Sequence, residues 1–96
     1  MLEVRQTDEF AAWLRSLVDA RARGRIAARI DRMALGNPGD VAPVGEGVSE
    51  MRIHYGPGYR VYFVERGATY TLLIGGDKST QAADIRTAKQ LAIRER

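Results

Sequence analysis

The 96-residue sequence contains no cysteine, a single histidine (His54) and only two lysines (Lys78 and Lys89). The lack of cysteine excludes a disulfide framework and any thiolate metal site. The N-terminus lacks the basic-then-apolar pattern of a secretory signal, and no apolar run approaches the length of a membrane span. We therefore expect a soluble cytoplasmic protein with no membrane contact, no metal and no cofactor.

Arginine supplies almost all of the positive charge. The formal net charge is +3, and hydrophobic residues make up 45% of a chain that suits one domain over residues 1–96. Because the planar guanidinium suits phosphate and carboxylate groups, a polyanion or an acidic protein is an expected partner. A solvated basic surface without a ligand is the alternative interpretation.

Apolar residues at helical spacing predict an antiparallel pair of helices after a short first strand over residues 2–7. Two stripes carry this prediction: Phe10, Trp13, Leu14, Leu17 and Val18 in the first helix, and Ile26, Ile30, Met33 and Ala34 in the second. A break is expected within residues 19–24, and "GNPGD" ends the second helix. The following "GNPGDVAPVGEG" is predicted to be a loop.

Three strands and a last helix are expected in the C-terminal half. The strands span about 48–55, 59–66 and 69–75, and the helix about 80–94. The short connections "GPG" and "GA" favour antiparallel hairpins. The predicted fold class is therefore α+β in the order β-α-α-β-β-β-α, with a helical hairpin packed on an antiparallel sheet and a C-terminal helix.

The length of the first hairpin loop determines which side chains meet. With "GPG" as a three-residue loop, His54 lies opposite Arg60, and one face collects Arg52, His54, Arg60 and Tyr62. With Gly67-Ala68 as a two-residue turn, Phe63 faces Leu72 and Arg60 faces Gly75. These two register predictions bring Lys78 to the same rim.

The predicted cluster of Arg52, His54, Arg60 and Lys78 has no acidic residue within the stretch "MRIHYGPGYRVYF". Four positive or potentially positive groups repel one another, so the pattern predicts an anion-binding surface. An isolated His54 would instead be interpreted as an exposed strand histidine. On the second helix, Arg21, Arg25, Arg29 and Arg32 form a basic stripe, which is either a solvated helix face or a contact with RNA or a partner.

The stretches "GVSEMRIHYGPGYRVYF" and "LLIGGDKSTQAADIRTAKQLA" resemble the addiction-module killer protein group, HigB-like members of the RelE/ParE superfamily of bacterial toxin–antitoxin toxins. The resemblance covers residues 3–94 and implies a RelE-like microbial RNase fold with a last helix that is often mobile. It also implies ribosome-dependent cleavage of mRNA as the activity. The implied partners are mRNA on the ribosome and a cognate antitoxin, often a helix-turn-helix protein, so that DNA is contacted only through the antitoxin.

The resemblance also implies roles for individual residues. Arg60 matches the arginine at the scissile phosphate, while Arg52, His54 and Lys78 lie near the other basic positions. Where RelE carries a catalytic tyrosine, this chain reads Ala83-Asp84-Ile85, so the tyrosine role is vacant or moved to Tyr55, Tyr59 or Tyr62. Two alternatives stay open: a ParE-like inhibitor of DNA gyrase, and a non-catalytic module that binds RNA or an antitoxin.

Metal-free RNA cleavage uses the ribose 2′-OH as nucleophile and needs a base, an acid and stabilisation of the phosphorane charge. His54 is the expected base or acid because imidazole titrates near neutrality. Arg52 and Arg60 are expected to clamp the phosphate, and Lys78 to act as acid or electrostatic stabiliser. Tyr62, Gln81, Arg25 and Arg29 are expected RNA contacts. An acidic antitoxin segment is expected to cover Arg52, Arg60 and Lys78.

Overall fold

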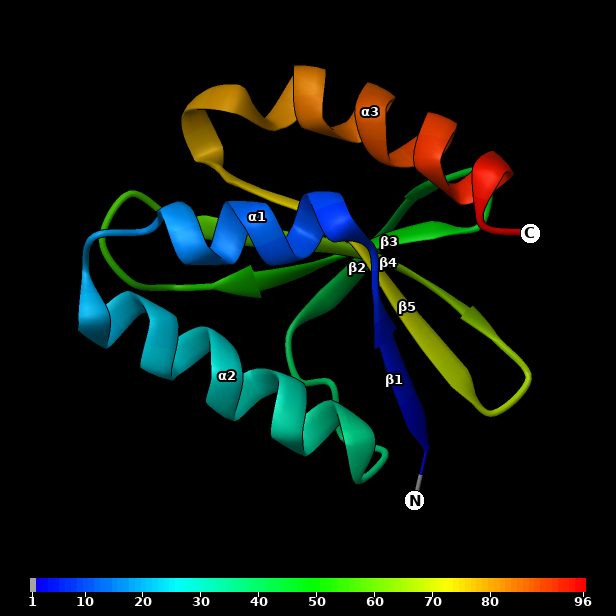
Figure 1. The fold of residues 1–96 in the computed structure, drawn as a ribbon, viewed down its shortest axis with the longest axis horizontal. Helices are drawn as coiled ribbons and strands as arrows, with labels where there is room; N and C mark the ends of the chain where they lie inside the picture. Colours follow the sequence, from blue (N-terminus) through cyan, green and yellow to red (C-terminus); the bar gives the residue numbers. More distant parts are fainter. Residues whose placement is uncertain (1) are drawn as a thin grey trace.

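A five-stranded sheet with helices on both faces forms the fold in the computed structural model, which describes residues 2–96 (Figure 1). The elements are β1 (Glu3–Gln6), α1 (Asp8–Ser16), α2 (Ala20–Ala34), β2 (Val41–Gly45), β3 (Val48–Ile53), β4 (Tyr59–Arg66), β5 (Thr69–Asp77), the 3-10 turn η1 (Lys78–Thr80) and α3 (Gln81–Arg94). The predicted α+β class, helical hairpin and last helix are confirmed.

The sheet differs from the prediction in two respects. Its order is β1-β5-β4-β3-β2, and β1 pairs with β5 in parallel, so the sheet is mixed rather than antiparallel. The strand β2 lies in the segment predicted to be a loop and pairs with β3, with Val41 opposite Met51. Pro43 is tolerated because β2 is an edge strand, where a missing N–H need not break a ladder bond.

Side-chain caps define where the two N-terminal helices begin. The hydroxyl of Thr7 accepts a hydrogen bond from the Phe10 backbone N–H (2.9 Å) and donates one to the Leu73 carbonyl (2.6 Å). Asp19 caps α2 by accepting from the N–H of Arg21 at 2.9 Å. The break therefore lies before residue 20, and Val18, predicted to be buried, is 94% exposed because it belongs to the connection.

Both faces of the sheet carry apolar cores. Under α1 and α2 lie Phe10, Ile26, Met33, Met51, Ile53, Val61, Phe63, Tyr70 and Leu72, with Trp13 packed against them. Under α3 lie Val48, Tyr62, Val64, Leu73, Ala88, Leu91 and Ala92. The second face was predicted to be polar, but α3 makes most of it a second core. Within residues 2–96, no helix has the length and apolar character needed to cross a membrane.

The C-terminal end of α3 is tied to both α1 and β4. The guanidinium of Arg94 donates two hydrogen bonds to the carboxylate of Glu9 in α1, at 2.6 and 2.8 Å. Arg66 of β4 donates to the carbonyls of Ala92 and Glu95, both at 2.9 Å. The Arg66 contacts satisfy carbonyls that a helix end leaves without intrahelical partners, and both sets of contacts hold α3 across the sheet.

The ion pair between Glu9 and Arg94 predicts a specific acid sensitivity. Hydrogen bonds from Arg94 lower the pKa of Glu9 from 4.5 to about 2. A carboxyl with a depressed folded-state pKa stabilises the fold above its unfolded pKa and loses that contribution as the pH falls through the folded value. We expect Glu9→Gln to weaken the dependence of melting temperature on pH between 4.5 and about 2, as followed by circular dichroism.

Glu65→Gln is the matched control, because Glu65 is exposed on β4 and the ion pairs of Arg94 are with Glu9 and Glu95. Its pH profile should follow that of the wild type. An unchanged profile in Glu9→Gln would show that the pair does not contribute to acid stability.

Candidate functional site

The hairpin between β3 and β4 brings Arg52 and Arg60 together. These two residues are directly opposed, and Ile53 opposes Tyr59, so the loop spans residues 54–58. Gly56 and Gly58 adopt positive φ angles of 56° and 80°, which allow this longer turn. The prediction that His54 lies opposite Arg60 is therefore wrong, because the strand register is shifted by two residues. The prediction that Arg52 and Arg60 share a face is confirmed, since a register shift of two residues leaves each side chain on the same face of the sheet.

A buried carboxylate, Glu50, lies at the centre of this cluster. Its side chain accepts a hydrogen bond from Arg52 Nε at 3.1 Å and one from Gln81 Nε2 at 2.8 Å. Arg60 Nε lies 4.0 Å from its second oxygen. The prediction of a cluster of cations without a nearby carboxylate is thus wrong, because the negative charge of Glu50 lies next to Arg52 and Arg60. Sequence reasoning missed Glu50, although it precedes Arg52 by two residues and alternation places it on the same face.

Arg60 is the buried cation of the site. It is 8% exposed, and its Nη1 makes only long hydrogen bonds, to the carbonyls of Gly58 (3.4 Å) and Tyr59 (3.3 Å). Its Nε has no hydrogen-bond partner within residues 2–96. Long hydrogen bonds are weak, so this guanidinium retains capacity for an anion. Lys78 lies beside it: a Cβ at Gly58 would be 3.5 Å from Lys78 Cβ and 3.7 Å from Arg60 Nη1.

His54 lies in the hairpin loop directly after β3 instead of opposite Arg60. Its Nε2 is 2.6 Å from Asp40 Oδ2, and its side chain is 71% exposed. The other oxygen of Asp40 lies 3.6 Å from Arg52 Nη1. The hydrogen bond with His54 lowers the pKa of Asp40, with a further contribution from Arg52. Asp40 is therefore a second carboxylate that sequence reasoning missed, and it joins His54 to the cluster through Arg52.

Tyr62 lies on the same face as Arg60 but is fully buried beneath α3. Its hydroxyl has no hydrogen-bond partner among the described residues. Burial raises the pKa of Tyr62, and the charges of Glu50 and Asp84 raise it further. The sequence prediction of a Tyr62 side chain open to RNA is corrected, because α3 covers it.

The first turn of α3 approaches the sheet over Gly76. The predicted pair of Phe63 with Leu72 between β4 and β5 is confirmed. The predicted pair of Arg60 with Gly75 is wrong: Arg60 lies opposite Gly76, because the strand register shifts by one residue between Tyr62 and Phe63. A Cβ at Gly76 would lie 1.8 Å from Asp84 Oδ2. Thr80 donates to the same oxygen at 2.5 Å. Glycine at 76 thus lets α3, and with it Gln81, reach the site.

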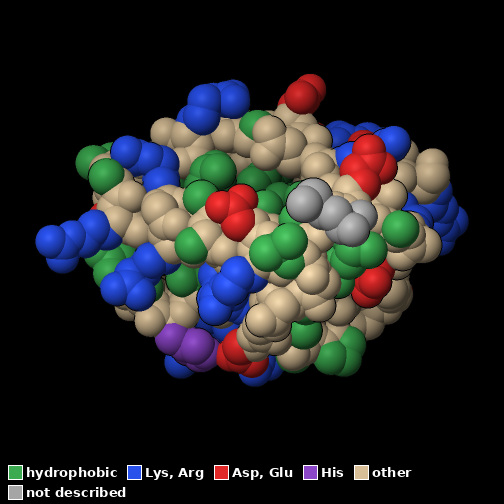
Figure 2. All heavy atoms as spheres, turned by 90° about the horizontal axis from the view of Figure 1, so that it is seen from below, with side chains coloured by type: hydrophobic (Ala, Val, Ile, Leu, Met, Phe, Trp, Pro, Cys, Tyr) green, Lys and Arg blue, Asp and Glu red, His purple; other side chains and the backbone are tan. Residues whose placement is uncertain are grey.

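The basic stripe of α2 borders a groove next to His54. The groove has a volume of about 290 Å³ and is lined by Arg25, Ala28, Arg29, Arg32, Ile53 and His54. Figure 2, which is turned by 90° from Figure 1 so that the molecule is seen from below, shows Lys and Arg side chains gathered near the histidine.

Two arginines of this groove also make structural contacts. The Arg25 guanidinium lies 4.6 Å from the centre of the Tyr55 ring. Arg29 donates to the carbonyls of Arg52 (2.6 Å) and Pro38 (2.9 Å), so it also holds the end of β3. Two residues of the groove thus connect it to the cluster around Glu50: Arg29 through the Arg52 carbonyl, and His54 through Asp40.

Comparison with known proteins identifies a relative by sequence and two solved structures with a similar fold. No family model matches the chain. A Haemophilus influenzae protein described as "Uncharacterized protein" is 47% identical over 92 residues, which cover 95% of this chain and 93% of that protein.

Two solved structures share the fold at low identity. A chain of the intact E. coli RelBE toxin–antitoxin complex has a TM-score of 0.67 at 10% identity, covering 80% of this chain and 96% of that chain. The solution structure of the conserved hypothetical protein HP0894 from Helicobacter pylori has a TM-score of 0.50 at 16% identity, with 82% and 97% covered. The fold is therefore RelE-like.

The close approach of α3 to Gly76 predicts the effect of adding one methyl group. Gly76→Ala would place a carbon against Asp84 and Thr80, and overpacking of this kind costs about 1–3 kcal/mol. We expect a lower free energy of unfolding in urea. The control is Gly24→Ala, an interior position of α2 with nothing within 4 Å of the added carbon, which should stabilise by about 0.5–1 kcal/mol. Equal stability of the Gly76 variant and the wild type would contradict the described packing.

Proposed function

The chain belongs to the same protein family as the Haemophilus influenzae relative, and we propose that it is the toxin of a type II toxin–antitoxin pair, an endoribonuclease that cleaves mRNA on the ribosome. The observation that carries this proposal is Arg60, a nearly buried guanidinium with long, weak hydrogen bonds that lies beside Arg52 and Lys78. The RelE-like fold supports it, since that fold occurs in the RelBE toxin–antitoxin complex.

The proposed partners rest on the similarity to the RelBE complex. The RelBE structure contains an antitoxin, and we propose a cognate antitoxin of the helix-turn-helix type for this chain. The assignment to the HigB-like group rests on the motifs of β3, β4 and β5. The toxin would act in the cytoplasm on mRNA bound to the ribosome and would meet DNA only through the antitoxin.

In the proposed reaction, Arg60 and Arg52 bind the scissile phosphate and stabilise the charge that develops on it. Preorganised donors of this kind are effective because they need no reorganisation when charge develops. Glu50 holds Arg52 by a hydrogen bond and lies 4.0 Å from Arg60, so it orients both cations. Lys78 is the proposed acid or electrostatic stabiliser, placed at the rim by η1.

Glu50 is the proposed acceptor of the 2′-OH proton in place of His54. It is the carboxylate next to both phosphate-binding arginines, whereas His54 lies in the hairpin loop beside Asp40 and is linked to the cluster only through Arg52. Gln81 donates to one Glu50 oxygen at 2.8 Å, and each carboxylate oxygen has a second lone pair that can accept the proton. His54 is instead proposed to contact the RNA beside the groove of α2.

Substitutions at Arg60 and Glu50 test the proposal. We expect Arg60→Ala and Glu50→Gln each to lower mRNA cleavage by about 100-fold or more, since loss of one stabilising donor costs about 100–1,000-fold in other enzymes. His54→Ala should lower cleavage less than either. Growth arrest on induction and cleavage by ribosomes programmed with a defined mRNA are the two measurements.

The matched control is Arg86→Ala, an exposed arginine of α3 away from the cluster, which should act as wild type. Circular dichroism establishes that each variant is folded. Full toxicity of folded Arg60→Ala would refute the assignment. Loss of gyrase-dependent DNA supercoiling without mRNA cleavage would identify a ParE-like inhibitor, and absence of growth arrest by the wild type would indicate a non-catalytic binding module.

The groove beside α2 is the proposed path of the RNA next to the scissile phosphate. Arg25, Arg29, Arg32 and His54 border it, and Arg29 also contacts the backbone of Arg52 in the cluster. Arginines spaced along one helix face suit successive phosphates of a single strand. Tyr62 enters the proposal only as part of the buried core beneath α3, not as an RNA contact.

Salt dependence of RNA binding tests this path. Each lost phosphate contact should reduce the slope of log affinity against log salt by about 0.7 for a single strand. We expect Arg25→Gln combined with Arg32→Gln to weaken binding of an oligoribonucleotide and to reduce the slope by about 1–2. The control pair, Arg15→Gln with Arg86→Gln, carries the same charge change outside the groove. Equal slopes for the two pairs would exclude a groove-specific path.

A further inference from the structure

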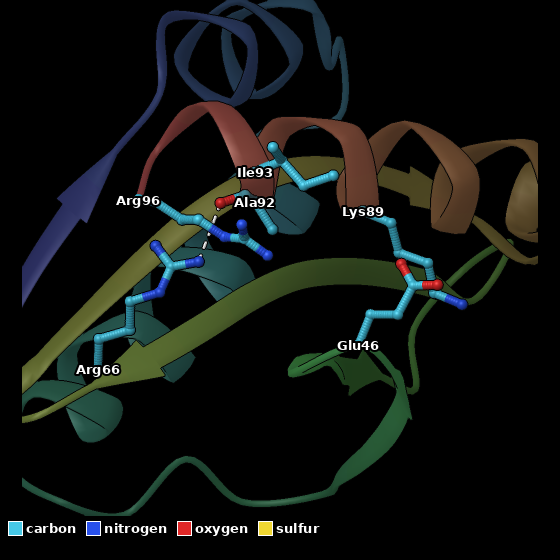
Figure 3. A pocket seen from close by; sticks show the side chains of 6 residues that line it. All are labelled: Glu46, Arg66, Lys89, Ala92, Ile93 and Arg96. Atoms are coloured by element: carbon cyan, nitrogen blue, oxygen red, sulfur yellow. Dashed lines mark hydrogen bonds between the residues drawn. The ribbon is translucent and has the colours of Figure 1, made fainter.

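A second cavity lies far from the cluster around Glu50, at the C-terminal end of α3. Its volume is about 380 Å³, and its lining comes from β4, α3 with the residue that follows its C-cap, and the turn between β2 and β3: Glu46, Arg66, Lys89, Ala92, Ile93 and Arg96. Figure 3 shows Arg66 and Arg96 on one side of the cavity and Lys89 with Glu46 on the other. None of these residues belongs to the proposed catalytic site.

The lining of this cavity combines an excess of cations with an apolar side chain. Three cations and one carboxylate give it a positive charge, and Ile93 is 58% exposed beside the buried Ala92. Arg66 is held in place by its hydrogen bonds to the carbonyls of Ala92 and Glu95, both at 2.9 Å. The guanidinium therefore needs little ordering when an anion arrives, which lowers the entropic cost of binding.

We propose that this cavity is a docking site for an acidic, partly apolar peptide segment of a partner protein. A carboxylate side chain suits Arg66, Lys89 and Arg96, and a neighbouring apolar side chain suits Ile93. A nucleic-acid strand fits less well, because the lining has no aromatic ring on which a base could stack, and Ile93 offers an apolar surface instead. The identity of the partner as the antitoxin rests on the function proposed above.

The position of the cavity gives the docking site a separate role. Arg66 lies six residues after Arg60 on the same strand, a separation of about 20 Å at the usual rise of a strand. A short segment confined to the cavity therefore leaves Arg52 and Arg60 uncovered. The partner is held at one end of β4, and any inhibition of the catalytic cluster requires a second segment at the other end.

Titration of the full chain with a synthetic peptide of alternating glutamate and leucine tests the site directly. We expect saturable NMR shifts of the Ile93 methyl groups below about 1 mM peptide. Lys89→Glu should weaken binding at least about tenfold by replacing attraction with repulsion. The control is Arg86→Glu, which reverses a charge three residues away on α3 outside the cavity and should change affinity less than about twofold. Arg66 is not substituted because it also caps α3.

The outcomes separate the cavity from the proposed function. No saturable shift at Ile93, equal effects of the two reversals, or shifts at Ile93 with oligouridylate but not with the peptide would each overturn the docking site. Peptide binding at Ile93 in a protein that does not arrest growth upholds the docking site and refutes the toxin assignment. Growth arrest without peptide binding refutes the docking site alone.

Discussion

The geometry of the site depends on the contacts that the buried carboxylate of Glu50 makes with its neighbours. An isolated buried charge costs several kcal/mol, so its partners must be held close. Those partners come from three elements: Arg52 from β3, Arg60 from β4 and Gln81 from α3. The hairpin and the last helix therefore meet at one buried ion cluster, and a change in either element moves the arginines that are proposed to bind phosphate.

The location of the site follows from how far α3 covers its face of the sheet. The middle of this face is apolar and lies under Ala88, Leu91 and Ala92, with Tyr62 beneath them. Coverage stops at the first turn of α3, where Glu50 is 3% exposed but its partner Arg52 is open to solvent at one end. A boundary of this kind places fixed charges next to an apolar wall, where electrostatic interactions are stronger than in water.

Prediction from the sequence succeeds where one period or one residue type decides the outcome. Strand alternation places Arg52 and Arg60 on one face, since a period of two depends only on parity. The opposed pairs depend on loop length, and a glycine-rich turn permits three residues or five. Glu50 follows from the same alternation and could have been predicted. The contact of Asp40 with Arg52 and His54 could not have been predicted, because it depends on the pairing of β2 with β3. The strand β2 is an edge strand that contains Pro43, and its residue propensities alone predict a loop.

The pairing of β1 with β5 determines when the fold can be completed. The partner of β1 is the strand at the opposite end of the chain, and Thr7 reaches the carbonyl of Leu73 across 66 residues. Contacts this distant in sequence require closure of a long loop before they stabilise anything, which slows folding. A nascent chain therefore has no place for its first strand until β5 has been synthesised, and the complete sheet that supports Arg52 and Arg60 forms only near the end of translation.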